Sequence, residues 1–194
     1  MKLYIVRHGQ TDWNIKKQSQ GVADIELNAT GIAQAEELAA EIRRRGLEFD
    51  AVYSSPLRRA KKTAEIITTA PVSHADSSPS AGHNIIYDDR LVERSYGDLE
   101  GKVVDWDHLG ADDLSIRQNT NIYNIEPIRT VLARAQSFLD DLKSRYADQS
   151  DIRILVVAHG TLLKALHYAI VGYDEDTDLR GFHLENCELT EYDV

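Results

Sequence analysis

Apolar and polar positions along the chain fall into two alternating patterns. Short apolar runs rich in β-branched residues predict strands over Leu3–Val6, Ala51–Ser55, Ile85–Tyr87 and Ile154–Ala158, with a last strand from roughly Phe182 to Tyr192. Between them lie longer segments in which apolar residues recur every three to four positions, the period of an amphipathic helix. Strands alternating with helices favour an α/β fold in which a mainly parallel central sheet carries helices on both faces.

Four helices are predicted, and each begins at a recognisable signal. Asn28 precedes the first, Pro56 opens the second, Glu126-Pro127 starts the third, and Gly160 starts the fourth, which ends near Gly172. The residues expected on their buried faces are Ile32, Ala35, Leu38, Ala39 and Ile42; Leu57, Ala60, Ala64 and Ile67; Ile128, Val131, Leu132, Ala135, Phe138, Leu139 and Leu142; and Leu162, Leu163, Ala165, Leu166, Ala169 and Ile170.

The remaining segments are polar or irregular. Lys16–Asp24 and Thr68–Asn84 are predicted loops, and Val103–Asn124 is mixed, acidic and expected to include a short helix. This last stretch belongs to a short insertion around 95–125 that could cover a site. A chain of 194 residues is expected to form a single three-layer α/β/α domain spanning residues 1–194.

Composition narrows the classes of function. The formal net charge of −10 argues against binding to nucleic acid or to anionic membranes. No apolar run is long enough to span a membrane, and the N-terminus lacks the apolar segment of a signal peptide. The one cysteine, Cys187, excludes an internal disulfide and fits a reducing compartment, so a cytoplasmic location is expected. Nothing in the sequence indicates an oligomeric state.

Two of the predicted strands end in the same way. The first runs into Arg7-His8-Gly9, and the fourth runs into His159-Gly160. Because open α/β sheets place their sites at the carboxyl ends of their strands, both histidines should lie there. Gly9 is expected to let the backbone approach a ligand closely. We therefore predict that the two histidines face one phosphate.

These residue types indicate a covalent route for phosphate chemistry. The seven histidines include no His-x-His or His-x-x-x-His pair, and no glycine-rich phosphate loop is present, so neither a metal nor a cofactor is expected. His8 would attack phosphorus and carry the phosphoryl group. Arg7 and a second arginine would disfavour the imidazolium form of His8, while a backbone carbonyl would hold its other ring nitrogen. His159 is expected to donate to a phosphate oxygen, beside the Gly160 amide at a helix N-terminus.

A carboxylic acid must protonate the leaving oxygen and later deprotonate water. Glu93 is the candidate by its position in an irregular stretch just after a strand, although spacing alone does not separate it from Asp88, Asp89 or Glu100. The acidic cluster at 105–113 is expected to be a solvated face.

Four cations crowd the start of the second helix, where they oppose the helix dipole. A bound anion would offset that cost for one arginine, but spacing does not choose between Arg58 and Arg59. Lys61 and Lys62 are expected to be solvated. Ordinary core or surface roles are expected for the other histidines, His74, His83, His108, His167 and His183.

Four motifs resemble those of the histidine phosphatase superfamily, which includes cofactor-dependent phosphoglycerate mutases and many small phosphatases. Arg7-His8-Gly9-Gln10-Thr11, followed by Trp13-Asn14, resembles the family signature, and Val157-Ala158-His159-Gly160 resembles the second-histidine motif. Ser54–Ala60 is similar to the second-arginine motif, and Leu91-Val92-Glu93 with two later glycines resembles the proton-donor segment. The likeness covers nearly the whole chain and implies a phosphoglycerate mutase-like fold.

The resemblance implies a role for each matching residue. His8 is phosphorylated, Glu93 is the acid, and no metal takes part. Arg59 is implied rather than Arg58, because the functional arginine of the motif directly precedes the alanine. The implied phosphate-binding residues are Arg7, Asn14, Arg59 and His159. Substrate selectivity is expected from residues 20–25 and 95–124, and the further binding residues expected are Gln20, Gly21, Tyr96, Gly160 and Thr161.

The branch of the superfamily is decided by smaller features. The segment Glu93–Gly101 resembles the mutase version, yet the insertion after it is short and acidic, with Lys102 and Arg117 as its only cations before Glu126. Small phosphatases often carry Gly-Glu-Ser before the long helix, where this chain has Ile125-Glu126-Pro127. An acidic cover suits a substrate with one phosphate. We therefore expect hydrolysis of a small phosphorylated metabolite, with a phosphoglycerate mutase or a non-catalytic phospho-ligand binding protein as alternatives.

Overall fold

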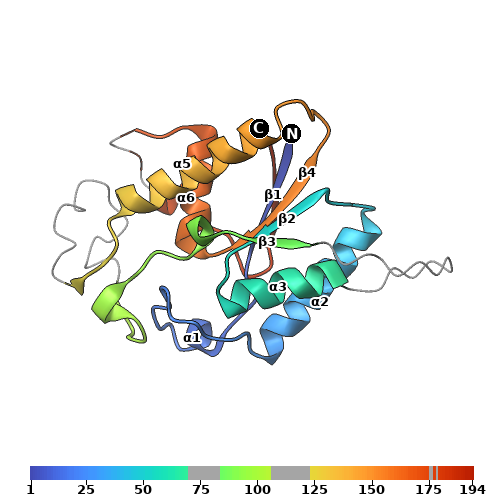
Figure 1. Ribbon diagram of the computed structural model, residues 1–194. Coiled ribbons are helices and arrows are strands. Elements are labelled where there is room, and N and C mark those ends of the chain that lie inside the picture. Colours follow the sequence, from blue (N-terminus) through green and yellow to red (C-terminus); the bar gives the residue numbers. More distant parts are fainter. Residues whose placement is uncertain (70–83, 106–122, 175–176, 178) are drawn as a thin grey trace.

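Five strands form one sheet in the computed structural model, which describes residues 1–69, 84–105, 123–174, 177 and 179–194. The strand order is β3-β2-β4-β1-β5 (Figure 1). The strands are β1 (Lys2–Arg7), β2 (Ala51–Ser54), β3 (Ile85–Tyr87), β4 (Arg153–Ala158) and β5 (Leu189–Asp193). Only β5 pairs antiparallel, with β1, so the prediction of a mainly parallel sheet is confirmed.

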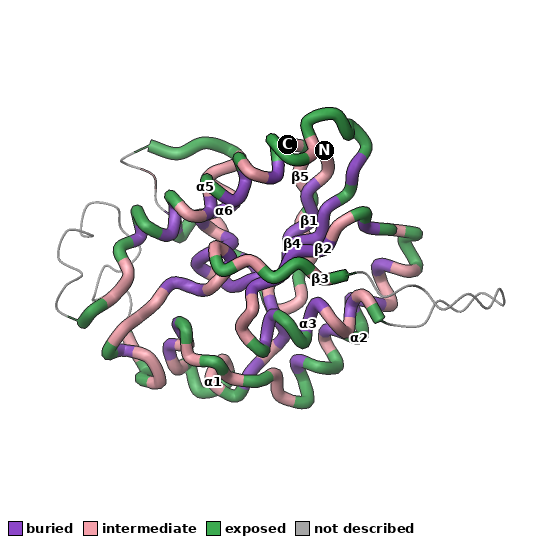
Figure 2. The backbone as a smooth tube through the Cα atoms, viewed as in Figure 1, coloured by how far each residue is buried: buried purple, intermediate pink, exposed green. Residues whose placement is uncertain are grey.

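Two helices cover each face of the sheet (Figure 1). Helices α2 (Ala29–Arg44) and α3 (Arg58–Thr69) pack on one face, and α5 (Ile128–Arg145) and α6 (Gly160–Val171) pack on the other. Side chains alternate along β1: Leu3 and Ile5 join the core under α5 and α6, while Tyr4 and Val6 join the core under α2 and α3. The central strands are consequently buried on both sides (Figure 2), as expected for a three-layer α/β fold.

Two helix starts show how local chemistry sets the boundaries. The Asn28 side chain accepts the Gly31 N–H at 2.8 Å and caps α2. Helix α3 begins at Arg58 and not at Pro56 as predicted, because the Leu57 N–H bonds to the Ser55 hydroxyl at 3.3 Å before the helical turns start. Ile32, expected on the buried face of α2, is 37% exposed.

The last strand is shorter than predicted. Residues 182–188, which were predicted to belong to this strand, lie outside the sheet, and β5 begins at Leu189. The reason lies at Cys187, whose φ of 58° turns the chain aside even though its N–H still donates to the Arg7 carbonyl at 2.9 Å. The displaced segment reaches back to the end of β1, where the Arg7 guanidinium donates to the Leu184 carbonyl at 2.8 Å and the Asn186 amide donates to the His8 carbonyl at 2.7 Å.

Neighbouring parallel strands carry the two histidines. Arg7 stands opposite Ala158 in the register of β1 and β4, and the His8 N–H donates to the Ala158 carbonyl at 3.0 Å. His8 and His159 therefore leave the sheet at the same edge. No helix in the described part of the chain is long and apolar enough to cross a membrane. Most of the predicted cover insertion and of the Thr68–Asn84 loop lies outside the described residues.

Candidate active site

A cavity of about 260 Å³ opens at the carboxyl ends of β1 and β4. It is lined by every residue predicted for the site except His159, and by four residues that were not predicted. The full lining is Arg7, His8, Asn14, Gln18, Ser19, Gln20, Gly21, Arg59, Glu93, Tyr96, Gly160, Thr161, Lys164 and His183. The segments that converge here come from both ends and the middle of the chain.

His8 is held as a neutral ring with one free nitrogen. Its Nδ1 lies 2.7 Å from the Gly9 carbonyl oxygen, which can only accept, so Nδ1 carries the proton and Nε2 keeps a lone pair. Burial, and then the guanidinium groups of Arg59 and Arg7, hold the pKa of His8 well below its ordinary value. The sequence predicted both the carbonyl and the arginines, but burial is the larger cause.

Two arginines supply positive charge to the cavity. Arg59 is fully buried and donates from both terminal nitrogens to the loop carbonyls of Ala23 at 2.7 Å and Gly21 at 2.8 Å. Burial lowers the pKa of Arg59 to about 10, so the side chain is charged at neutral pH. Burial also lowers the pKa of Arg7, and the Glu93 carboxylate opposes that change. Among the described residues, the buried Nε–H of each arginine has no hydrogen-bond partner.

His159 stands beside His8 as the N-cap of α6. The two ring centroids lie 5.2 Å apart, and His159 is fully buried. Its Nε2 lies 2.8 Å from the Ser55 hydroxyl, whereas its Nδ1 has no partner within the described chain. Burial, then Arg59, keeps the pKa of His159 well below its ordinary value. His159 is not part of the cavity lining, so its donation to a phosphate oxygen stays a prediction.

Glu93 is buried against the first turn of α6. Its Oε1 accepts the N–H groups of Arg94 at 2.8 Å and Leu162 at 3.1 Å, and its Oε2 accepts, among the described residues, only the Thr161 N–H at 3.1 Å. Oε2 thus keeps more acceptor capacity for a proton-transfer partner. Gly160, the first residue of α6, lines the same cavity, and its N–H makes no hydrogen bond within the described residues.

The other acids that spacing left open lie elsewhere. Asp88 caps a 3-10 turn at Asp89–Leu91 (η1) and pairs with Arg90 at 2.6 Å, and Asp89 is exposed on that turn. Glu100 does not line the cavity, and its Oε1 accepts the N–H groups of Val22 and Tyr96, each at 3.0 Å. Of the four acids, only Glu93 lines the cavity.

Gly21 and Asn14 also line the cavity. A Cβ on Gly21 would lie 2.0 Å from Glu100 Oε1, and the φ of Gly21 is +52°, so this position needs a residue without a side chain. The Asn14 carbonyl oxygen accepts the N–H and the hydroxyl of Thr11, both at 3.0 Å, which leaves the amide NH₂ of Asn14 to donate into the cavity.

Gly9 lies close to the start of α2. A Cβ on Gly9 would lie 2.4 Å from the carbonyl oxygen of Gly31 at the start of α2. The close approach that the structure shows is therefore to another backbone segment, and the approach of Gly9 to a ligand stays a prediction.

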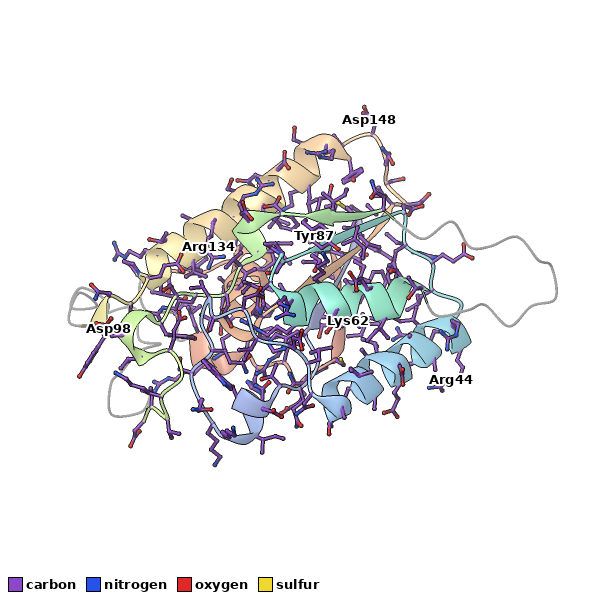
Figure 3. The ribbon with its side chains drawn as sticks, turned by 60° about the horizontal axis from the view of Figure 1, so that its bottom comes forward. Arg44, Lys62, Tyr87, Asp98, Arg134 and Asp148 are labelled. Carbon is purple, nitrogen blue, oxygen red and sulfur yellow. The ribbon has the colours of Figure 1, made fainter. Side chains whose placement is uncertain are left out.

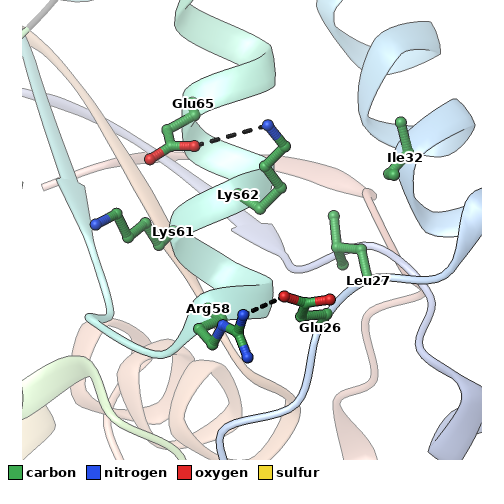
Figure 4. Close-up of a pocket in the computed structure, with 7 residues that line it drawn as sticks. All are labelled: Glu26, Leu27, Ile32, Arg58, Lys61, Lys62 and Glu65. Atoms are coloured by element: carbon green, nitrogen blue, oxygen red, sulfur yellow. Dashed lines mark hydrogen bonds and ion pairs between the residues drawn. The ribbon is translucent and has the colours of Figure 1, made fainter.

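Arg58 and Arg59 point to different places. Arg58 is exposed and lines a separate surface hollow of about 360 Å³, where its guanidinium pairs with Glu26 (Figure 4). Lys62 pairs with Glu65 on the same surface at 3.9 Å. The Arg58 backbone N–H also bonds to Asp24 at 2.7 Å. Arg59, one position on, turns inward to the cavity.

Several residues at the site were not predicted from the sequence. Lys164 lies four residues after Gly160, so helical spacing puts both on one face of α6, and that spacing could have found it. Ser55 follows β2, and the strand-end rule that located the histidines applies to it too. Gln18, Ser19 and His183 come from irregular segments that gave no pattern. No cluster of three or more metal-ligating side chains occurs within the described residues.

Comparison with known proteins shows the family to which the chain belongs. The family model described as the histidine phosphatase superfamily, branch 1, matches residues 3–194. The chain is 35% identical over 191 residues to the uncharacterized phosphatase PhoE of Bacillus subtilis, covering 96% of this chain and 88% of that one. It is 31% identical over 181 residues to a 2,3-bisphosphoglycerate-dependent phosphoglycerate mutase of Methylorubrum populi, covering 90% and 81%.

A solved structure extends the likeness to three dimensions. The phosphoserine phosphatase of Entamoeba histolytica, in complex with 3-phosphoglyceric acid, superposes with a TM-score of 0.74 at 28% identity, covering 98% of this chain and 89% of that one. Family model, relatives and fold therefore agree, and the chain belongs to the histidine phosphatase superfamily, in the branch that holds both phosphatases and phosphoglycerate mutases.

Proposed function

We propose that this protein hydrolyses phosphomonoesters of small metabolites through a phosphohistidine at His8. One observation carries the proposal: the free Nε2 of His8 shares a buried site with the unpartnered Nε–H groups of Arg7 and Arg59. A phosphoryl group offers three oxygens to such donors while phosphorus meets the ring nitrogen. The unpartnered Nδ1 of His159 supports the same reading.

The reaction proceeds in two displacements. His8 Nε2 forms a bond to phosphorus as the bond to the substrate oxygen breaks, and Glu93 gives that oxygen a proton. Water then attacks the phosphohistidine, Glu93 takes a proton from it, and inorganic phosphate leaves with His8 regenerated. Glu93 Oε2 is suited to both transfers because it accepts one N–H where Oε1 accepts two.

A phosphoglycerate mutase is the second candidate, supported by the mutase relative and by the mutase-like segment Glu93–Gly101. In that reaction the phosphoryl group on His8 passes to a hydroxyl group of phosphoglycerate, at a different position of that molecule, instead of to water. The acidic residues after Glu100 favour a substrate that brings one phosphate and not two.

Assays on purified protein with a chelator present separate the candidates. We expect p-nitrophenyl phosphate to be hydrolysed, acid-labile phosphate to accumulate on the protein, and His8→Ala to abolish both. Binding of a phosphorylated ligand without turnover would indicate a phospho-ligand binding protein. Transfer of phosphate between phosphoglycerate positions at a higher rate than hydrolysis would indicate a mutase. Glu93→Gln should slow poor leaving groups more than good ones, and equal slowing would remove Glu93 from the acid role.

A further inference from the structure

The chain on either side of Glu93 is held by two residues outside the cavity. Glu126 precedes α5, and Arg134 lies on α5 (Figure 3). Their side chains form a two-point ion pair, with Arg134 Nε 3.0 Å from Glu126 Oε1 and Arg134 Nη2 3.2 Å from Glu126 Oε2. Both side chains are largely buried, 17% and 18% exposed.

Arg134 binds the backbone of the segment that precedes Glu93. Its Nη1 donates to the carbonyl of Arg90 at 2.7 Å and to the carbonyl of Val92, the residue directly before Glu93. One planar guanidinium thus contacts two backbone carbonyls and a carboxylate, a geometry that a lysine ammonium does not reproduce.

Glu126 binds the segment that follows Glu93. Its carboxylate accepts the Ser95 N–H at 3.1 Å, and its backbone N–H donates to the Ser95 carbonyl at 2.9 Å. Its own carbonyl accepts the Nε–H of the fully buried Arg94 at 2.8 Å. Three contacts from one residue therefore fix the two positions that follow Glu93.

We propose that the Glu126–Arg134 ion pair is the positioning device for the Glu93 carboxylate. The proposal rests on the proposed function. Neither residue lines the cavity, and among the described residues neither forms a hydrogen bond or ion pair with Arg7, His8, Arg59 or His159. Loosening the pair shifts the acid while the phosphate-binding groups stay in place. A proton transfer tolerates such a shift poorly, since misplacement by about 1 Å can cost about 100-fold.

Leaving-group dependence tests the proposal. Glu126→Gln removes the charge pair with little change in shape, and Arg134→Lys keeps the charge but not the fork. We expect each variant to lower kcat/KM for an alkyl phosphomonoester about tenfold or more while changing kcat/KM for p-nitrophenyl phosphate by less than about threefold. The inhibition constant of inorganic phosphate should stay at the wild-type value.

Asp141→Asn is the matched control. Asp141 is a carboxylate on the same helix that pairs with the side chains of Arg90 at 3.1 Å and Arg145 at 3.4 Å, and among the described residues it bonds to no backbone group of residues 90–95. This variant should lose stability without changing the ratio of the two substrates. The proposal would be overturned if each variant lost the same factor in kcat/KM on both substrates, whether or not the variant unfolds. In that case the ratio of the two kcat/KM values would equal that of the wild type. If the wild-type protein hydrolysed neither substrate, the proposed function itself would fail, which is a separate result.

Discussion

The rings of His8 and His159 lie 5.2 Å apart between centroids, with an angle of 57° between their planes. They belong to opposite ends of the chain, and the sheet brings them together because β1 and β4 are neighbours in parallel register. Both rings are buried beside the same two arginines, whose charges add to the burial that keeps each ring neutral. The pair therefore provides a nucleophilic nitrogen and a hydrogen-bonding ring without a like-charge clash.

Buried neutral histidines make the stability depend on pH. The pKa of both His8 and His159 is depressed in the folded chain, so between that lowered value and about 6.5 only the unfolded chain binds their protons. The free energy of unfolding should therefore fall as pH drops below about 6.5, by up to about 1.4 kcal/mol per pH unit for each ring.

Urea denaturation between pH 7.5 and pH 5 measures this slope. His8→Asn should flatten it, whereas His183→Asn, which changes an exposed side chain, should leave it as in the wild type. The same slope in the wild type and in His8→Asn would contradict the expectation.

Adjacent arginines offer an internally controlled test of phosphate binding. Arg59→Lys removes the Nε–H from the cavity and one of the two donors to the carbonyls of Gly21 and Ala23, and we expect kcat/KM to fall about 100-fold or more. Arg58→Lys changes only an exposed pair with Glu26, and its kcat/KM should remain within about twofold of wild type. Similar losses in both variants would show that charge at the helix start matters and not the buried site.

Substrate binding should be sensitive to one methyl group added at Gly21, which lines the cavity. Gly21→Ala places a Cβ against Glu100 and must displace the carboxylate that accepts the Val22 and Tyr96 N–H groups, so KM should rise about tenfold. Gly46 also has a positive φ, +61°, but has no atom within 4 Å of an added Cβ. Gly46→Ala should lower stability by about 1 kcal/mol and leave KM unchanged, and a matching rise in KM would point to backbone strain as the cause in both.

Ser55 should set the tautomer of His159. The Ser55 hydroxyl oxygen accepts the Leu57 N–H and can give its proton to His159 Nε2, which would place the ring proton on the unpartnered Nδ1. Ser55→Ala should then weaken binding of inorganic phosphate about tenfold by calorimetry, the loss of about one hydrogen bond. Ser54→Ala removes an equally buried hydroxyl that bonds only to the Ser55 carbonyl, and the affinity for phosphate should be unchanged. Equal affinities in both variants would rule out this role for Ser55.

Sequence patterns predicted the layers of the fold and most of the residues that line the cavity. Alternating strands and amphipathic helices predicted the mainly parallel sheet because a buried strand and a two-faced helix leave different periods in the sequence. The strand–His–Gly junctions pointed to the correct edge of the sheet, since the direction of parallel strands puts their carboxyl ends together. Resemblance to known motifs then chose Arg59, a choice that spacing could not make.

Contacts between distant segments were beyond those patterns. The end of β1 is held by Asn186 and Leu184 only because Cys187 turns the chain out of the sheet, and neither residue type signals such a role. Glu126 looked like a departure from a phosphatase motif, yet it anchors the segment around Glu93.

Local periodicity and the direction of the strands were enough to predict the sheet, its four long helices and the edge of the sheet where the candidate site residues gather. Motif resemblance already implied Glu93 and Arg59, and the folded chain shows that these two side chains line the cavity, but which ring nitrogens stay free could be read from the three-dimensional contacts alone. Those outcomes depend on hydrogen bonds between residues far apart in the chain, such as Glu93 with the start of α6, and no local pattern encodes them.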